Sequence, residues 1–203
     1  MKREYKKLYS PSSKEVELID VPEFNFIIID GAIEKGKTPG NSPSFAEAVE
    51  ALYGLSYALK FMTKKRNDNP VDYSVMPLEG LWWVEDKNFD IKIKDNWFWS
   101  VRILQPDFIT RDMFEQAKIA VKKKKNNPSI DKTVFSKFKE GISVQIMHIG
   151  PYTTEPETVA KMDSFIEKNG YKFNGIHHEI YLSDPRKAQP EKMKTILRHP
   201  VIK

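Results

Sequence analysis

The 203-residue sequence contains no cysteine. This excludes disulfides, thiolate zinc sites, iron–sulfur clusters and cysteine nucleophiles. The sequence also lacks an apolar run close to the ~20 residues that span a bilayer, and no apolar signal core follows the polar N-terminal residues MKREYKK. We therefore expect a cytoplasmic protein with no membrane partner.

The motifs of common cofactor and metal sites are missing as well. No Walker motif, dinucleotide fingerprint, GxSxG elbow or kinase motif occurs. The four histidines do not follow a metal-binding spacing such as HExxH. The sequence therefore predicts a protein that uses neither a cofactor nor a metal.

Basic residues exceed acidic residues, 33 against 28, which gives a formal net charge of +5. Such a surplus raises the question of nucleic-acid binding. The one dense basic run, Lys122 to Lys125, lies just before Pro128, a pattern typical of a solvated helix end. No zinc-finger spacing or RNP-like motif accompanies it, so we expect no direct contact with nucleic acid.

Hydrophobic patterning in the first half predicts a strand, a helix and two further strands. A run rich in β-branched and aromatic residues favours a strand over 23–34. A helix then begins near Pro43, with Ser42 or Ser44 as its cap, and carries apolar residues at helical spacing up to Met62. Two strands are predicted at 77–85 and 96–105, separated by turn residues over 86–95.

The second half repeats this order. A strand over 142–149 ends at Gly150 and Pro151, and an amphipathic helix over 155–169 ends at Gly170. Two strands follow at 176–183 and 193–202. A separate helix over 110–124, with Thr110 as its cap, joins the halves.

The repeated order, strand–helix–strand–strand, predicts an α+β fold. We expect two modules that form one antiparallel sheet with helices on one face, the other face being covered by a ligand, by loops or by a partner. The expected organisation is a single domain over 1–203. It comprises an N-terminal extension (1–22), a first module (23–105), a linking helix and loop (106–141) and a second module (142–203).

The segment HHEIYL, residues 177–182, carries the most chemistry. Alternation on a strand places His177, Glu179 and Tyr181 on one face and the other three residues on the opposite face. If Ile180 and Leu182 pack under the helices, Glu179 faces away from them. A carboxylate among aromatic rings would be desolvated and suited to proton transfer or to pairing with a cation. The alternatives are that Glu179 lies on a wet sheet face or that it makes an ordinary salt bridge.

Aromatic clusters on the two strands of the first half give the second signal. Alternation makes both Trp82-Trp83 and Trp97-Phe98-Trp99 place rings on both faces of a sheet. One face would be core, and the other would be either a wall for a flat ligand or a second aromatic core. At the turn after residue 149, Tyr152 either projects into a site between the modules or packs as a turn residue. The candidate ligand-binding residues are therefore Trp82, Trp83, Trp97, Trp99, His148 and Tyr152.

Four segments resemble the stand-alone GyrI-like small-molecule-binding proteins. They are MPLEGLWW (76–83), HIGPY (148–152), HEIYLSDPRK (178–187) and KTILRHPV (194–201). The third is long and specific, and the resemblance in element order covers nearly the whole chain. It implies two modules related by a pseudo-twofold axis, with a ligand cleft on the sheet between them.

The resemblance also implies roles for particular residues. Glu179 matches the cavity glutamate of the family, with Tyr181 as its neighbour, and Trp82 or Trp83 belongs to the aromatic wall. Related domains are the drug-sensing parts of transcription regulators, and some stand-alone members hydrolyse cyclopropanoid DNA-alkylating compounds. A strand that begins near Glu23 leaves no room for a helix-turn-helix module before it.

Three functional hypotheses follow. The first is a detoxifying hydrolase for strained, electrophilic aromatic compounds, in which Glu179 and Tyr181 are catalytic: the carboxylate directs or deprotonates a water and the hydroxyl donates to the oxygen that gains charge. The second is a binder that sequesters cationic or hydrophobic drugs, with Glu179 as counter-ion. The third is a role in protein interaction, in which a partner such as gyrase docks on the sheet.

Overall fold

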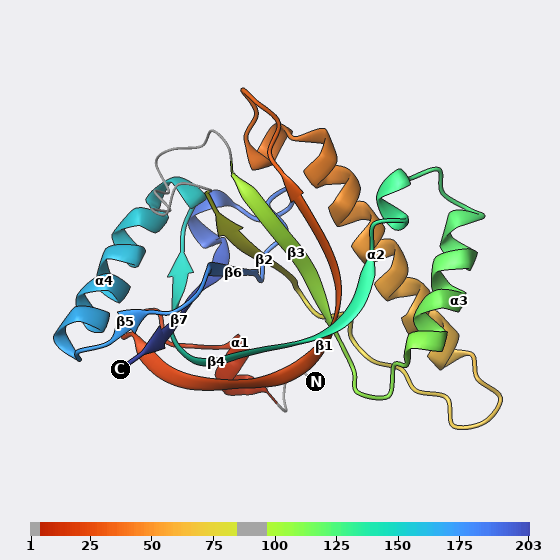
Figure 1. Cartoon of the computed structure of the whole chain (residues 1–203), viewed down its shortest axis with the longest axis horizontal. Helices are drawn as coiled ribbons and strands as arrows, with labels where there is room; N and C mark the ends of the chain where they lie inside the picture. The colour runs from red at the N-terminus through yellow and green to blue at the C-terminus, as the bar shows by residue number, and fades with distance from the viewer. Residues whose placement is uncertain (1–4, 85–96) are drawn as a thin grey trace. The chain divides into compact units, whose positions relative to one another are not determined.

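A computed structural model describes residues 5–84 and 97–203 of the chain (Figure 1). The described chain divides into two compact units. The first comprises residues 24–78 and 97–138, and the second comprises residues 5–23, 79–84 and 139–203. The predicted turn over 86–95, and with it Glu85 and Asn96 at the ends of the flanking strands, lies outside the described residues.

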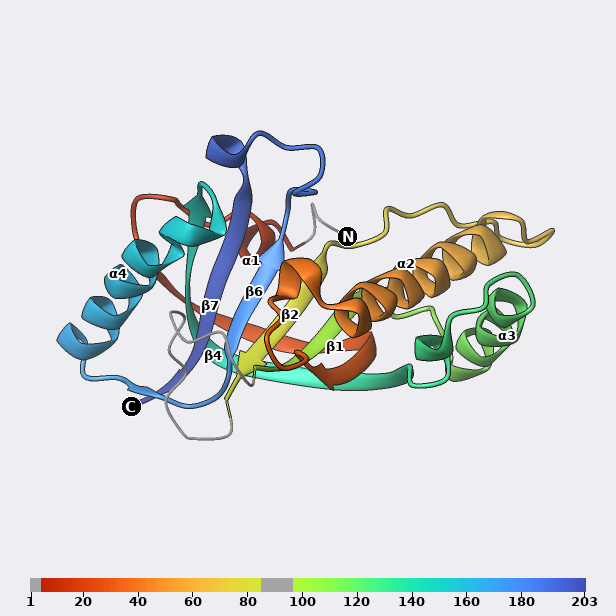
Figure 2. The same cartoon turned by 90° about the horizontal axis from the view of Figure 1, so that it is seen from above.

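The first unit pairs two strands beside two long helices. β1 (Glu17–Ala32) is antiparallel to β3 (Phe98–Gln105), with Ile27 opposite Ile103. α2 (Pro43–Lys64) and α3 (Arg111–Lys122) lie side by side (Figure 1, Figure 2). Leu52, Leu55 and Leu59 of α2 are fully buried, so this helix supplies much of the unit's core.

Local hydrogen bonds explain where α2 begins. The Ser42 hydroxyl accepts from the amide of Phe45 at 3.2 Å and donates to Glu34 at 2.5 Å. Pro43, whose missing amide would have no partner in the first turn, occupies the first helical position. Of the two predicted candidates, Ser42 is therefore the cap, and Thr110 caps α3 in the same way, as predicted, by accepting from Met113.

The second unit is built on an antiparallel sheet. β7 (Lys194–Ile202) pairs with β4 (Val134–Ile149) on one side and with β6 (His177–Tyr181) on the other. β2 (Leu78–Trp83) neighbours β6, and the short β5 (Lys172–Phe173) pairs with the end of β7. The unit also contains α1 (Lys6–Tyr9) and α4 (Glu155–Lys168).

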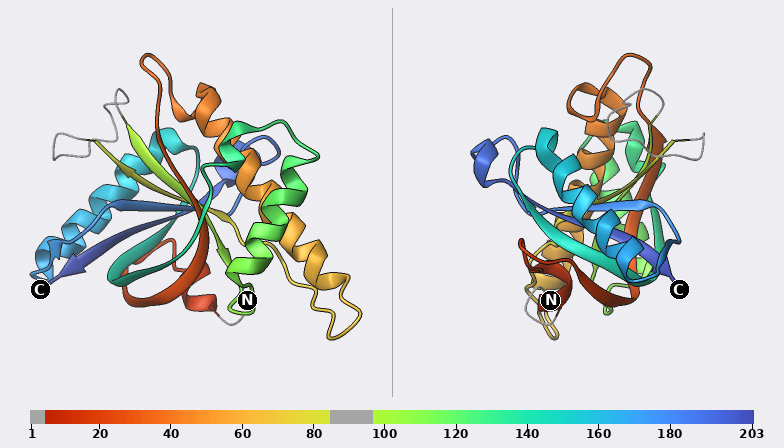
Figure 3. Two further views of the ribbon diagram at one scale, coloured as in Figure 1. Left: turned by 45° about the vertical axis from the view of Figure 1, so that its right-hand side comes forward. Right: turned by 90° about the vertical axis from the view of Figure 1, so that its left-hand side faces the viewer.

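α4 packs on one face of this sheet, as Figure 3 shows. Its residues Met162 and Ile166 form a buried cluster with side chains of β4 and β7, namely Val144, Ile146, Leu197 and Val201. Directly opposed residues of antiparallel strands share a face. Since Glu179 lies opposite Leu197, and Leu197 opposite Ile146, the Glu179 side chain lies on the face that α4 covers.

This register corrects one expectation. We expected Ile180 to pack under the helices and Glu179 to face away from them, but the reverse holds for α4. His178, opposite Arg198, points to the other face of the sheet together with Ile180. Alternation along the strand divides its residues between the two faces of the sheet. It does not show which face the helix covers, because Glu179 is flanked by apolar as well as polar residues.

The element order agrees with the prediction. β1–α2–β2–β3 is followed by β4–α4–β6–β7, with β5 as an additional short strand, and the fold is α+β with antiparallel strands. β1 and β4 each begin earlier than predicted, at Glu17 and Val134. In the part of the chain that the structure describes, no helix combines the length and the apolar character needed to cross a membrane.

Candidate functional site

Glu179 is a buried carboxylate at the centre of β6. Only 6% of the residue is exposed. The neighbouring β7 places Thr195 and Leu197 on the same face, and α4 begins above them. The alternative of a wet sheet face is therefore excluded for this side chain.

Tyr181 and Trp82 form a hydrogen-bonded chain that ends at Glu179. The indole Nε1 of Trp82 donates to the Tyr181 hydroxyl at 2.8 Å, and that hydroxyl is in turn hydrogen-bonded to Glu179. Gly80 makes room for this chain, because a Cβ at position 80 would lie 2.9 Å from the indole nitrogen and 3.2 Å from the hydroxyl oxygen. Burial, and then the charge of Glu179, raise the pKa of Tyr181 well above its usual value.

Glu155, which the sequence analysis did not single out, faces Glu179. It is the first residue of α4, is 2% exposed, and is hydrogen-bonded to Thr195 through one side of its carboxyl group. Its Oε1 has no hydrogen-bond partner among the described residues. Burial, followed by the negative charge of Glu179, raises the pKa of Glu155 to about 9. The group is therefore a neutral acid near pH 7.

Tyr152 closes this group of residues. It opens the 3₁₀ turn Tyr152–Thr154, and its ring meets that of Tyr181 edge-to-face, with centroids 6.1 Å apart and planes at 89°. The residue is 39% exposed. Burial of the hydroxyl and the nearby charges of Glu179 and Glu155 raise its pKa. We call Glu155, Glu179, Tyr181, Tyr152 and Trp82 the carboxylate site.

His177 approaches the carboxylate site from the same strand. Its Nε2 lies 3.5 Å from Glu179 Oε1, and its residue is 3% exposed. The ring is 6.0 Å from that of His199, and its charge acts on Asp163 of α4. Burial is the main reason why the pKa of His199 is lowered to about 4, so this neighbour is a neutral ring at physiological pH.

The other predicted tryptophans lie elsewhere. Trp99 is 2% exposed in the core of the first unit, edge-to-face with Phe45 at 5.5 Å. Its ring also fills the space where a side chain at Gly31 would lie. Trp97 is buried in the same unit, and Trp83 is half-buried on β2. The structure brings Trp82, Tyr152 and Tyr181 together with Glu179, and ligand binding by all the predicted residues stays a prediction.

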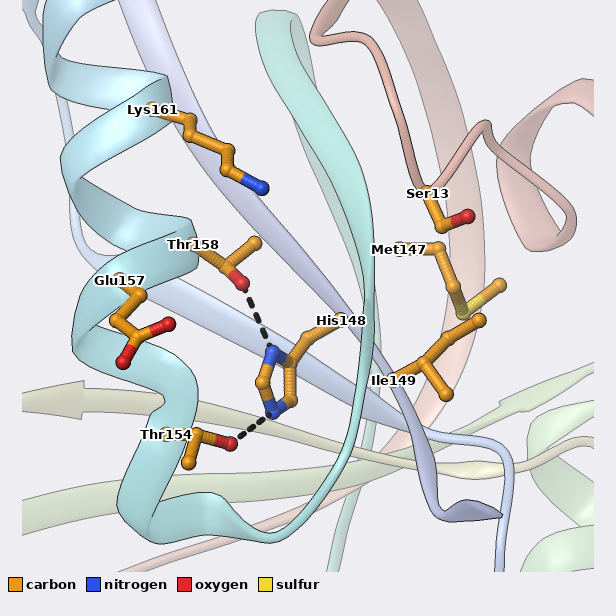
Figure 4. A pocket seen from close by; sticks show the side chains of 8 residues that line it. All are labelled: Ser13, Met147, His148, Ile149, Thr154, Glu157, Thr158 and Lys161. Atoms are coloured by element: carbon orange, nitrogen blue, oxygen red, sulfur yellow. Dashed lines mark hydrogen bonds between the residues drawn. The ribbon is translucent and has the colours of Figure 1, made fainter. Parts of the chain in front are cut away.

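His148 takes part in a different pocket. This pocket has a volume of 290 Å³ and lies between α4, the end of β4 and the N-terminal segment (Figure 4). His148 Nδ1 is 2.8 Å from the Thr158 hydroxyl, and Nε2 is 3.2 Å from the Pro151 carbonyl. Glu179 and Tyr181 do not line it.

A buried ionic network occupies the opposite face of the same sheet. We define it by Glu79, His178, Glu140 and Arg198. His178 is 3.2 Å from Glu79 through Nε2 and 2.9 Å from Glu140 through Nδ1. Glu140 also meets Arg198 at 3.1 Å. The charge and hydrogen bonds of both carboxylates raise the pKa of His178 despite its burial, so the network pairs two cations with two anions.

The network also holds the N-terminal segment. Arg198 donates to the Leu8 carbonyl at 2.7 Å, and Gln145 donates to the Lys7 carbonyl at 2.7 Å. The Tyr9 hydroxyl donates to Glu79 at 2.6 Å. These buried side chains were not predicted, because charged residues within strands carry no periodic signal of their own. Among the described residues, no group of three or more histidine, aspartate or glutamate side chains is placed to hold a metal ion.

The unit thus brings together two buried carboxyl groups, one from β6 and one from the start of α4, beside the aromatic rings of Tyr152 and Tyr181. The chain belongs to the GyrI-like family, since the model of the GyrI-like small molecule binding domain matches residues 14–201. No protein with a curated description matches it.

Three solved structures from Listeria innocua resemble the chain over 99% of its length and 98% of their own. An uncharacterized conserved protein is 44% identical with a TM-score of 0.88. A hydrolase is 42% identical with a TM-score of 0.83, and a hydrolase encoded by lin2189 is 45% identical with a TM-score of 0.85.

Proposed function

We propose that this small-molecule-binding protein is a hydrolase that adds water to cyclopropanoid or related electrophilic aromatic compounds and so detoxifies them. The observation that carries the proposal is the buried pair Glu155 and Glu179, in which burial and the charge of Glu179 raise the pKa of Glu155 to about 9. A buried carboxyl group whose pKa is raised keeps its proton near pH 7 and is suited to the acid role in a reaction in which a neighbouring group acts as base. Two similar structures, at 42% and 45% identity, are described as hydrolases.

The chemistry assigns one step to each carboxyl group. Glu179 accepts a proton from a water whose oxygen attacks the strained ring carbon. The ring carbon–carbon bond breaks, and its electron pair moves through the conjugated system to a carbonyl oxygen. Glu155 donates its proton to that oxygen, and the proton held by Glu179 then returns to Glu155, so that water is added and both residues are restored.

The aromatic residues of the carboxylate site hold and orient the groups. The Tyr181 hydroxyl accepts a hydrogen bond from Trp82 and donates one to Glu179. The second bond fixes the carboxylate and uses the proton of the hydroxyl. Tyr181 therefore positions the base. Glu155 takes the role of proton donor, which we first expected Tyr181 to have. The rings of Tyr152 and Tyr181 offer apolar surface to a flat substrate, at roughly 25 cal/mol per Å² buried.

The test is turnover of a cyclopropanoid substrate in ¹⁸O-labelled water, followed by mass spectrometry. We expect Glu179→Gln and Glu155→Gln each to lower kcat by about 100-fold or more, since acid–base catalysis contributes on that scale. Glu167→Gln, an exposed position on the same helix, is the matched control and should leave kcat unchanged. Equal rates for all four proteins would refute the assignment.

A non-catalytic binder of cations is the second candidate. The same buried carboxylates, edged by the rings of Tyr152 and Tyr181, are the groups that a cationic aromatic compound would need. A binder would return the compound intact, without the ¹⁸O label, and Glu179→Gln would then reduce affinity instead of turnover.

A further inference from the structure

α2 carries apolar side chains on two sides. Leu52, Leu55 and Leu59 are fully buried in the core of the first unit. Tyr57 and Phe61 project from the opposite side of the helix and are 47% and 49% exposed. A helix at the surface ordinarily presents charged and polar residues on that side. A second apolar side is therefore typical of a helix that has a partner there.

Three aromatic rings form a continuous row along this exposed side. Tyr53, Tyr57 and Phe61 follow one another at a spacing of four residues, so they lie one above the other on the helix. Each ring stacks on the next, with centroids 6.4 Å apart and interplanar angles of 30° and 28°. Because the stacking holds the rings in place, they present a surface that is already ordered before a partner binds. We call these three residues the aromatic ridge.

Charged residues of opposite sign lie at the two ends of the aromatic ridge. Helical periodicity puts Glu50 and Lys64 in line with the three rings. Their side chains are 55% and 52% exposed. Within the first unit, Glu50 pairs with Lys125 at 2.6 Å and Lys64 pairs with Asp72 at 2.7 Å. The stripe thus runs from an acidic end across three rings to a basic end.

This order makes the stripe complementary to a second copy of itself. Tyr57 lies midway between Tyr53 and Phe61, and also midway between Glu50 and Lys64. When two copies of α2 pack antiparallel with Tyr57 on a twofold axis, each Tyr53 ring meets a Phe61 ring. The same packing brings each Glu50 carboxylate to a Lys64 ammonium. A parallel arrangement would instead set like charges against each other at both ends.

The ion pairs within each chain are compatible with this contact. An ammonium group has three donors and a carboxylate has two oxygens, so each can hold two partners at once. Lys125 and Glu50 of one copy would be followed by Lys64 and Asp72 of the second copy. The four groups form a row in which every neighbour has the opposite sign, and the twofold axis generates this row at both ends of the aromatic ridge.

We propose that the aromatic ridge joins two copies of this chain into an antiparallel, twofold-symmetric dimer. The stripe from Glu50 to Lys64 is about 21 Å long, at 1.5 Å per residue. It covers less than the ~800 Å² per partner of a standard interface, so the dimer is reversible and dissociates on dilution. The proposal is independent of the hydrolase chemistry, because it uses none of the residues of the carboxylate site.

Sedimentation equilibrium of the full-length protein over a concentration series tests the dimer. The parent should pass from monomer to dimer as its concentration rises through the micromolar range. Tyr57→Glu puts two carboxylates on the twofold axis and should abolish the dimer. Phe173→Glu changes an aromatic residue of the second unit that is 53% exposed, and this matched control should dimerise like the parent.

Charge-reversal variants test the antiparallel orientation. Glu50→Lys and Lys64→Glu should each weaken self-association about tenfold or more, because each sets like charges against each other at both ends of the aromatic ridge. An equimolar mixture of the two variants should dimerise like the parent, since both contacts then join opposite charges again. Mixing cannot restore an ion pair lost within one chain, so the recovery separates the interface from the pairs with Lys125 and Asp72.

Three results would overturn the proposal. The first is a parent protein that stays monomeric up to about 1 mM. The second is a dimer that persists in Tyr57→Glu, which would place the interface elsewhere. The third is a mixture of Glu50→Lys and Lys64→Glu that associates no better than either variant alone, which would contradict the antiparallel pairing.

Discussion

Adjacent residues of β6 serve opposite faces of one sheet. Glu179 belongs to the carboxylate site under α4, and His178 belongs to the buried ionic network on the other side. A change at one of these positions therefore acts on a different set of partners from a change at the next.

The protonation of Glu155 should make stability depend on pH. Its native pKa of about 9 lies above the ordinary value of 4.5, so the native state binds more protons than the unfolded state between these two values. Stability is therefore expected to fall as pH rises through that range. Glu155→Gln, which stays neutral, should raise the free energy of unfolding relative to the parent, by roughly 3 kcal/mol at pH 7.

Urea unfolding at a series of pH values measures this effect. The difference between Glu155→Gln and the parent should vanish below pH 4.5 and grow above it. Glu167→Gln, exposed on the same helix, should show no such growth. A pH-independent difference would mean that Glu155 is already ionised in the native protein at neutral pH.

At the scale of residues, sequence reasoning identified Glu179 and missed its partner Glu155. Glu179 follows from the pattern HHEIYL and from the family resemblance, and the structure shows that it is buried. Its role in a ligand cavity stays a prediction. Glu155 opens a helix, where an acidic residue ordinarily needs no further explanation. Only the packing of α4 on β6 and β7 shows that this carboxyl group is withdrawn from water.

At the scale of elements, the buried ionic network joins strands that are far apart in the sequence. Glu140 of β4 contacts both His178 of β6 and Arg198 of β7, and its side chain is 2% exposed. The positive charges of these two partners, with their hydrogen bonds, outweigh burial and lower the pKa of Glu140 to about 2. Its contribution to stability is thus present above pH 4.5 and is lost as pH falls toward 2.

Removing this one charge should be costly. Glu140→Gln leaves His178 and Arg198 buried with one carboxylate fewer, and we expect it to lower the free energy of unfolding by about 3 kcal/mol at neutral pH. Asp131→Asn is the matched control, because Asp131 pairs with Lys122 at 2.6 Å with both side chains about half exposed. It should change the free energy of unfolding far less, because the pair is exposed to solvent. Equal losses in urea unfolding would contradict the assignment.

The elements themselves were largely predictable, and their lengths were not. Side-chain chemistry alone predicted Thr110 as one helix cap and left Ser42 and Ser44 as alternatives for the other, of which the structure selects Ser42. β4 begins eight residues before the predicted strand because its first part, 134–141, mixes lysines with Phe135 and Phe138. A strand that is partly exposed on both faces lacks the apolar run on which such predictions depend.

At the scale of the whole molecule, two strands cross the division between the compact units. β1 and β4 each contribute residues to both units. Unfolding one unit would therefore unravel part of a strand whose remaining residues belong to the other unit. We expect a single calorimetric transition whose van't Hoff enthalpy equals the calorimetric enthalpy, as for a two-state protein.

Fragments provide the complementary measurement. A polypeptide covering residues 139–203 contains most of the second unit but lacks β2 and the N-terminal segment. It should show no cooperative transition of its own. Two resolved transitions in the full chain, or a folded fragment, would show that the units are independent.

The bond between Arg198 and the Leu8 carbonyl has a consequence for biosynthesis. The two residues are 190 positions apart, and the arginine lies in the last strand. On the ribosome, the emerging N-terminal segment must wait for almost the entire nascent chain before its buried partner exists. Premature termination anywhere before β7 therefore yields a product in which the Leu8 carbonyl lacks its buried donor, an incompletely folded form that cellular quality control can recognise.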